Sequence, residues 1–503
     1  MTGIDNTVSR RAFIGTVGAA GAALAIAGAA DAAKADETSW DEERDVVVVG
    51  LGGAGAAAAV CALDGGCSVC VIERAGRGGG ATLRSGGIVY MGGGTGLQKA
   101  LSVEDTPEDM AAYVRAMVGN TDEALLETYL SRSTWLYDWL VSQGVEFNGT
   151  LDDVSHSTEP PEGVSLHYTG NERCPEFAAI AKPAPRGHAT TEKSFGLFEP
   201  LETKVDTQAT VHYNTTATEL VCDEDGSVVG VACTDADGNP LRVKAAKGVI
   251  LCTGAYTLND AMLADYCSET LGCGKRTSGE FDMGDGIRMG QKVGAATSSM
   301  NRVNFNRSIY NYGDLAAGAL LDEWGHRYMA EDWHGGRVGL AIASHSPAKG
   351  FIILDSDTLA LAQQTPYGQY LESTASADTL EELFEQIDMP VENSLEAIER
   401  YNGFCADGED RDFHKSVEYL RPVVTAPFHA IDGSIASCGF HTLGGLKINT
   451  DAQVVDLDGN PIVGLYAAGR TSCGHFGKYA GSGSSIADAL TFGCIAGESV
   501  SKL

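Results

Sequence analysis

A glycine-rich turn near the N-terminus has the residue types and spacing that binding of a dinucleotide requires. It runs Gly50-Leu51-Gly52-Gly53-Ala54-Gly55, and Glu73 follows it further along the chain. Glycines at these positions let backbone N–H groups approach a pyrophosphate, and the acidic residue accepts hydrogen bonds from ribose hydroxyls. The pattern predicts cofactor contacts at Gly50, Gly52, Gly53, Ala54, Gly55, Glu73 and Arg74.

The elements that must position this turn form a βαβ unit. Asp45–Val49 is a Val-rich run typical of a buried parallel strand, and an Ala-rich helix through Leu63 is expected after the turn. Ser68–Ile72 is the second strand, and it ends at Glu73. The glycine pattern alone is a weak signal, but strand, turn, helix, strand and acid in this order are specific for a Rossmann-like fold.

The rest of the chain predicts an α/β protein with an inserted domain. Residues 104–144 show helical spacing of apolar residues, and short β patterns recur from 210 to 250. The last of these strands ends at Thr253-Gly254, where the backbone is expected to meet the cofactor a second time. We therefore expect a Rossmann-like cofactor domain formed by residues 36–261 and 426–503, with an α+β capping domain at 262–425.

Length and charge narrow the function classes. A chain of 503 residues exceeds one comfortable core, so two domains are expected. The formal net charge of -33 argues against nucleic acid or an anionic membrane surface as a partner, because both require a basic face. A hydrophobic content of 44% is ordinary for a soluble globular protein that acts on a small molecule.

The N-terminal segment resembles an export signal rather than part of the fold. Ser9-Arg10-Arg11-Ala12-Phe13-Ile14 is a twin-arginine pattern, and an Ala/Gly-rich run and the small-residue pattern Ala33-Lys34-Ala35 follow it. The run is too short and too rich in Gly and Ala for a stable membrane anchor. Residues 1–35 are therefore predicted to direct export by the twin-arginine route to the periplasm, the cell envelope or the outside.

The thirteen cysteines have no spacing that defines a disulfide scaffold or a metal site. Cys61, Cys67 and Cys70 fall within the predicted βαβ unit, where they are expected to pack as small apolar residues. An iron–sulfur cluster is the alternative, although no four-cysteine motif of known spacing is present. No metal is predicted, and an anaerobic source would explain so many thiols in an exported protein.

Two distant glycine-rich segments resemble the fumarate reductase and 3-ketosteroid dehydrogenase superfamily of flavoproteins. Gly78–Gly87 is similar to the family's loop along the flavin, and Gly464–Arg470 followed by Gly483–Asp488 is similar to its second flavin-binding signature. The resemblance spans nearly all of the chain after the signal and implies FAD as the cofactor. It implies further flavin contacts at Ala81, Thr82, Ser85, Gly86, Gly87, Thr253, Gly254, Asp285, His441, Gly469, Ser484, Ser485 and Ile486.

The sequence departs from the fumarate branch of this family at its substrate-binding motif. Phe440 stands where fumarate reductases have a carboxylate-binding His, and His441 corresponds to the His beside the flavin. Tyr479-x-Gly-x-Gly483 instead resembles the ketosteroid dehydrogenase pattern, in which a Tyr hydroxyl and a Gly N–H hold a ketone oxygen. A dianion would lose charge-assisted contacts worth roughly 1.5–3 kcal/mol each. A Tyr that only packs against the flavin is the alternative.

The predicted capping domain supplies candidates for the acid. Its segment from Trp324 to Arg337 resembles the family's G-x-R-F-x-N-E motif, although Ala330 replaces the Asn and the Arg is shifted. Arg337 and His334 are the first candidates, with Tyr310 and Tyr312 in reserve as substrate contacts. A surface-loop histidine is the alternative for His334.

The leading hypothesis is an exported FAD enzyme that reduces, or forms, a C=C bond conjugated to a carbonyl of a neutral apolar substrate, such as a ketosteroid or a polyphenol-derived enone. An external electron donor, a cytochrome or a membrane redox protein in anaerobic respiration, is expected to supply electrons. A reductase of fumarate, urocanate or cinnamate is the rival enzyme, with Arg337 or Arg302 holding one carboxylate. A flavin electron carrier without catalytic activity is the alternative hypothesis from a different functional class.

Overall fold

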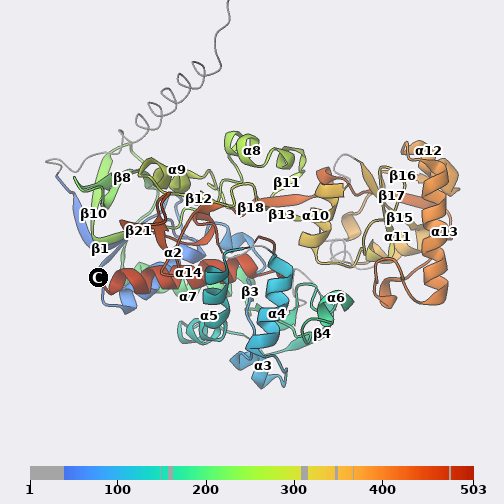
Figure 1. Cartoon of the computed structure of the whole chain (residues 1–503), viewed down its shortest axis with the longest axis horizontal. Helices are drawn as coiled ribbons and strands as arrows, with labels where there is room; N and C mark the ends of the chain where they lie inside the picture. The colour runs from blue at the N-terminus through green and yellow to red at the C-terminus, as the bar shows by residue number, and fades with distance from the viewer. Residues whose placement is uncertain are drawn as a thin grey trace, which may run out of the picture.

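The computed structural model describes residues 39–119, 121–147, 149–156, 162–307, 315–345, 349–365, 368–474 and 477–503. The chain forms a larger lobe and a smaller one, joined by a short ribbon of strands (Figure 1). The predicted signal segment and both reserve residues, Tyr310 and Tyr312, lie outside the described residues. Within these ranges no helix combines the length and the apolar character needed to cross a bilayer.

The larger lobe is built on a mainly parallel sheet whose central strand is the predicted Val run. Val46, Val47 and Val48 are fully buried, as expected for a parallel strand covered on both faces. Strand β1 pairs in parallel with β2 and β10, and the sheet extends outwards from both. The strands follow one another across the sheet as β20 (Gln453–Val455), β21 (Pro461–Ala467), β10 (Pro240–Leu251), β1 (Glu42–Val49), β2 (Val69–Ile72) and β7 (Thr210–His212).

Helix α2 (Gly53–Asp64) follows the glycine turn and packs closely against the C-terminal helix α14 (Ser484–Ser501). A Cβ at Gly493 would lie 2.5 Å from the carbonyl oxygen of Ala54, and one at Gly497 would clash with that of Ala58. These glycines therefore let the two helices touch through their backbones. The contact brings together the helices that follow the two glycine-rich segments, although these segments are far apart in sequence.

The remaining elements of the larger lobe surround this sheet. β8 and β9 form the predicted β meander with β10, and the predicted helical region contains α4 and α5. A second, four-stranded sheet follows the order β3-β6-β5-β4. The bounds are β3 (Ile88–Tyr90), α3 (Gly96–Ala100), α4 (Pro107–Val118), α5 (Glu123–Ser142), β4 (Leu151–His156), β5 (Leu166–Tyr168), α6 (Pro175–Ala178), β6 (Gly187–Ala189), α7 (Lys193–Gln208), β8 (Thr216–Cys222) and β9 (Val228–Thr234).

The smaller lobe is the expected α+β cap, but its bounds differ from those predicted. The last strand of its antiparallel sheet in the sequence is β17, which lies beyond the predicted limit at residue 425 and pairs with β15. Residues 262–302 pack on the larger lobe instead, where β12 (Thr297–Ser298) pairs with β19 (Gly445–Leu446). The cap contains β14 (Ala319–Asp322), α10 (Gly335–His345), β15 (Gly350–Asp355), α11 (Ser356–Ala362), β16 (Ala375–Ala377), α12 (Leu380–Gln386), α13 (Val391–Asp407) and β17 (Phe428–Asp432).

Two strands connect the lobes and pair with each other. β13 (Val303–Asn306) leads towards the cap, β18 (Gly439–Thr442) returns from it, and the two are antiparallel. Asn304 lies directly opposite His441 in this pairing, so both side chains point to the same face of the ribbon. Figure 1 shows β13 and β18 between the larger lobe and the cap.

Candidate functional site

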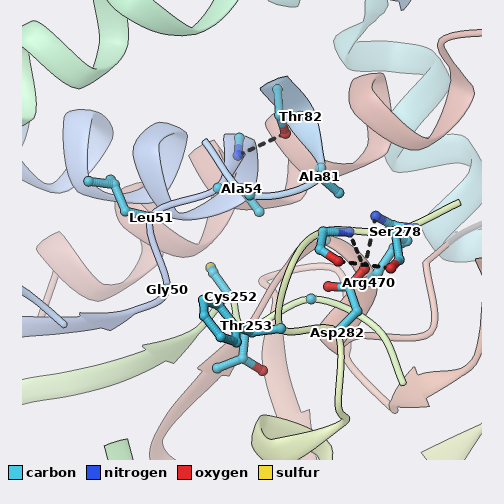
Figure 2. Close-up of a pocket in the computed structure, with 18 of the residues that line it drawn as sticks. Gly50, Leu51, Ala54, Ala81, Thr82, Cys252, Thr253, Ser278, Asp282 and Arg470 are labelled. Carbon is cyan, nitrogen blue, oxygen red and sulfur yellow. Dashed lines mark hydrogen bonds and ion pairs between the residues drawn. The ribbon is translucent and has the colours of Figure 1, made fainter. Parts of the chain in front are cut away.

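A cavity of about 440 Å³ lies in the larger lobe where the glycine-rich segments meet. Both glycine-rich segments border it, as does the end of β10. Figure 2 shows the turn after Gly50 and the Ala81–Thr82 segment on one side of it, with Ser278, Asp282 and Arg470 on the other. The predicted residues that line it are Gly50, Gly52, Gly53, Ala54, Glu73, Arg74, Ala81, Thr82, Ser85, Gly86, Thr253, Gly254, Asp285, His441, Gly469, Tyr479, Gly483, Ser485 and Ile486.

Glu73 braces the glycine turn from the end of β2. Its carboxylate accepts hydrogen bonds from the N–H of Leu51 at 2.6 Å and of Ala75 at 2.7 Å. Burial raises the pKa of this carboxyl above its ordinary value. The two N–H donors still favour the charged form, which leaves an acidic group at the cavity wall for a ribose.

The turn is also tied to the second loop of the cavity. The Gly53 N–H donates to the Thr82 hydroxyl at 3.0 Å, and the Gly79 N–H donates to the Leu51 carbonyl at 2.7 Å. The beginning of α2 therefore faces the cavity with its amide groups held in place. A helix N-terminus of this kind favours an anionic phosphate.

The turn requires glycines for two different physical reasons. Gly50 has φ 97°, and a Cβ there would clash with the carbonyl of Cys252, while a Cβ on Gly55 would clash with the carbonyl of Gly50. These two glycines are required by the fold. A Cβ on Gly52 would meet only the Gly79 oxygen at 3.9 Å and would otherwise project into the cavity. Gly52 therefore leaves room for a bound group, and the cradle fits the pyrophosphate of FAD.

Residues missed by the sequence reasoning form the opposite wall. Arg470 lies 3.4 Å from the Asp282 carboxylate, which also accepts a hydrogen bond from the Gly279 N–H at 3.0 Å. Arg470 stood within the quoted second signature but was not assigned a role. Asp282 carried no recognisable motif, because its function depends on a contact across the cavity. The newly found lining residues include Thr215, Thr216, Thr277, Ser278, Gly279, Asp282, Asn306, Arg470 and Ser482.

His441 and Tyr479 form a hydrogen-bonded pair at the cavity. His441 Nε2 lies 2.7 Å from the Tyr479 hydroxyl, and both residues line the cavity. Burial, with the nearby Arg470 guanidinium, holds the pKa of His441 well below its ordinary value. Burial also raises the pKa of Tyr479 to about 12. Both groups are therefore neutral near pH 7, and the phenol keeps its proton.

His334 lies behind the cavity wall rather than in it. Its side chain is buried, and its Nε2 lies 3.1 Å from the hydroxyl of Ser482, which does line the cavity. The Gly336 N–H donates to His334 Nδ1 at 3.2 Å, so Nδ1 is an acceptor and Nε2 carries the proton. His334 therefore donates to Ser482, and any contact with a substrate passes through that hydroxyl.

Other candidates lie away from the cavity. Arg337 pairs with Glu176 and stacks on the Trp333 ring, with its guanidinium carbon 3.3 Å from the ring centre. Phe440 is fully buried in the core, because it points to the opposite face of β18 from His441. Neither residue lines the cavity, and their roles as acid and substrate contact stay predictions. Gly55, Gly87 and Ser484 likewise support the cavity without lining it.

The capping-domain motif that preceded Arg337 holds the cap together. Arg327 binds both oxygens of Glu331, each at 2.8 Å, and also the Asp410 carboxylate at 2.8 Å. Lys415 lies 3.1 Å from Glu331, and all four side chains are at most 6% exposed. Two cations and two carboxylates balance within this buried cluster, which gives the charged residues of the motif a structural role in the cap.

Comparison with known proteins agrees with this geometry. The FAD binding domain family model matches residues 45–486. A 3-ketosteroid-Δ4-(5α)-dehydrogenase from Rhodococcus jostii RHA1, solved with 4-androstene-3,17-dione, is 33% identical with a TM-score of 0.88, covering 94% of this chain and 100% of that one. The urocanate reductase of Eggerthella lenta is 30% identical over 91% of this chain and 75% of its own length.

A further relative is longer than this chain. The NADH:acrylate oxidoreductase of Vibrio harveyi is 28% identical over 92% of this chain, which spans only 51% of that protein. The chain thus spans about half the length of that relative.

Proposed function

The chain belongs to the FAD binding domain family, and from this premise we propose that it is an FAD-dependent oxidoreductase acting on a C=C bond conjugated to a carbonyl. The substrate is neutral and largely apolar, and a 3-ketosteroid is its type. When bound, FAD supplies the hydride chemistry. The protein must hold the carbonyl oxygen, stabilise the charge that develops on it, and provide a proton.

The observation that carries this proposal is the neutral pair of Tyr479 and His441. A phenol with a pKa of about 12 keeps its proton at pH 7 and donates a hydrogen bond to a carbonyl oxygen. His441 orients that phenol at 2.7 Å without adding charge. The Gly483 N–H at the beginning of α14 is the second donor to the same oxygen. Such donors stabilise an enolate more than a ketone, which lowers the barrier.

The charges near Tyr479 favour a neutral substrate over a dicarboxylate. The cavity residues His441, Ser482 and Asn306 are uncharged under ordinary conditions. Two of the arginines that line the cavity are already committed to carboxylates, Arg74 to Asp285 at 3.1 Å and Arg470 to Asp282 at 3.4 Å. A substrate dianion would therefore have to displace a carboxylate from either of these two arginines.

Ser482 is the proton donor of the proposal. Its hydroxyl accepts from His334 Nε2 at 3.1 Å and lines the cavity, so its own proton is available to a substrate carbon. His334 holds the Ser482 oxygen in place from behind the wall and stabilises the negative charge that this oxygen acquires when it gives up its proton, which solvent then replaces.

Reduction of a small unsaturated acid is the second candidate, favoured by the 30% identity to a urocanate reductase. The flavin electron carrier is the non-enzymatic alternative. The test mixes the dithionite-reduced protein anaerobically with 4-androstene-3,17-dione, a flavonoid enone, urocanate and fumarate, and follows the flavin absorbance. Reoxidation by neutral enones supports the proposal, reoxidation by the acids alone supports the second candidate, and no reoxidation supports the carrier.

The compartment and the electron supply complete the proposal. We propose export on the strength of the twin-arginine pattern at Arg10-Arg11. An external redox protein, such as a cytochrome, then delivers electrons for reduction in an anaerobic respiratory chain. Fusion of residues 1–38 to a reporter, with and without an Arg10→Lys/Arg11→Lys change, tests the export step.

A further inference from the structure

The segment Thr169–Asn171, which follows β5, contacts both the loop that carries Tyr479 and the cap segment that carries His334. It lies in the larger lobe and does not line the cavity. Thr169 and Asn171 are buried, at 0% and 1% exposure. Their hydrogen bonds therefore form away from water, where geometry is held more tightly.

The contacts on the first side hold the Tyr479–Gly483 loop. The Ser482 N–H donates to the Thr169 carbonyl at 3.0 Å, and the Thr169 hydroxyl donates to the Ser482 carbonyl at 3.1 Å. The Tyr113 hydroxyl donates to the Ala480 carbonyl at 2.7 Å and accepts from the Asn171 N–H at 2.8 Å. The backbone on both sides of Gly481 is thus fixed by this segment.

The contact on the second side holds the cap. The Asn171 side-chain oxygen accepts from the His334 N–H at 2.9 Å. Since His334 also donates to Ser482, the bonds close a ring that runs through Ala480, Ser482, His334, Asn171 and Tyr113. The ring joins α4, the segment after β5, the cap and the beginning of α14. Within the described part of the chain, Asn171 is bonded both to the cap, through His334, and to α4, through Tyr113.

We infer that Asn171 is a positioning residue, which aligns His334 with Ser482 and fixes the cap edge over the Tyr479 loop. The expected effect of Asn171 on turnover rests on the proposed function, in which Ser482 is the proton donor. The alignment of His334 and of the cap edge by Asn171 does not depend on any substrate. Loss of the Asn171 oxygen should free the His334 N–H and let the cap edge and the loop separate.

The test uses the full-length holoprotein and four variants. Asn171→Leu keeps the size but removes the acceptor, and Tyr113→Phe removes the hydroxyl that links Asn171 to Ala480. Tyr129→Phe is the matched control, because Tyr129 is equally buried and its hydroxyl donates to the Tyr90 carbonyl at 2.7 Å, outside the ring. Asn171→Asp retains the acceptor oxygen and is the conservative rescue.

Hydrogen–deuterium exchange is the readout that does not depend on turnover. We expect Asn171→Leu and Tyr113→Phe to raise exchange at least tenfold in peptides covering both 333–337 and 480–484, with FAD content unchanged. Asn171→Asp and Tyr129→Phe should exchange there like the parent. Faster exchange confined to 165–177, unchanged exchange in both variants, or an equal rise in Tyr129→Phe would overturn the inference.

Turnover distinguishes the inference from the proposed function. Reoxidation of the reduced flavin by 4-androstene-3,17-dione should slow at least tenfold in Asn171→Leu and recover in Asn171→Asp, with little change in the half-saturating concentration. If the parent protein does not react with any enone, the proposed function fails, and the exchange result still decides the role of Asn171. If the parent protein reacts and Asn171→Leu reacts at the same rate, the inference about Asn171 is overturned and the proposed function is retained.

Discussion

His441 Nε2 and the Tyr479 hydroxyl lie 2.7 Å apart, although 38 residues separate them in the sequence. β18 supplies the imidazole, and the loop before α14 supplies the phenol. Burial lowers the pKa of His441 and raises the pKa of Tyr479 to about 12, so neither carries charge near pH 7. This pair therefore offers hydrogen bonding without charge, which suits a ketone oxygen better than a carboxylate.

Tyr479→Phe should lower the rate of flavin reoxidation by a neutral enone by about 100-fold, the usual cost of removing one oxyanion-hole donor. FAD content and the melting temperature should change little, because the ring remains in place. Anaerobic stopped-flow mixing at the flavin absorbance maximum measures the effect. A variant that reacts at the parent rate would remove the phenol from the mechanism.

Gly52→Val and Gly55→Val should fail in different ways. Gly52 leaves open space towards the cavity, so the valine is expected to give a folded protein that lacks FAD. Gly55 packs on the Gly50 carbonyl, so a side chain there should prevent folding. The ratio of flavin to protein absorbance, with circular dichroism, separates the two outcomes. Normal FAD content in folded Gly52→Val would contradict the placement of the pyrophosphate.

Stability should fall as the pH drops through the range set by His188. This imidazole is fully buried, and burial lowers its pKa to about 4 from an ordinary value of 6.5. Between these values the unfolded chain binds the proton and the folded chain does not, so the free energy of unfolding decreases with falling pH. The loss amounts to about 3 kcal/mol by pH 4.

Urea unfolding of the parent and of His188→Gln at pH 7 and pH 4.5 tests this contribution. Other groups titrate in the same range, so the difference between the two proteins is the relevant quantity. The variant should lose less stability on acidification than the parent. Parallel losses would show that His188 is not the group responsible.

Arg470→Met should make the flavin harder to reduce. Arg470 lines the cavity, and its positive charge acts on both His441 and Tyr479. Reduced flavin gains negative charge, which a nearby cation stabilises. We expect the midpoint potential to fall by about 30 mV, or ~1.4 kcal/mol for two electrons. Redox titration with indicator dyes measures it, and an unchanged potential would place Arg470 too far from the flavin ring.

Local patterns predicted the two glycine-rich segments that border the cavity. The turn from Gly50 to Gly55 and the acid at Glu73 lie within one βαβ unit, whose periodicity and glycines are visible in a short window. The second signature, around Gly469, likewise consists of a strand and a turn that are visible within a short stretch of sequence. These segments converge because α2 and α14 pack through glycines, and the structure confirms that they share one cavity.

Contacts between distant segments were not predictable in this way. Phe440 and His441 are neighbours in sequence, but alternation along β18 sends only His441 to the cavity, and the register with β13 decides which one. Asp282 and Asn171 carry no motif, since each acts through a partner far away in the chain. The catalytic role of Arg337 stays a prediction, and its pairing with Glu176 became visible only in three dimensions.

The ribbon of β13 and β18 means that the cap is attached through a paired pivot rather than two independent tethers. Any swing of the smaller lobe must bend both strands together, and Asn304 and His441 face each other within the bending region. Opening of the entrance for a substrate would therefore tilt the imidazole that orients the phenol. Access to the cavity and the readiness of Tyr479 to hold a substrate carbonyl would thus be linked in this chain.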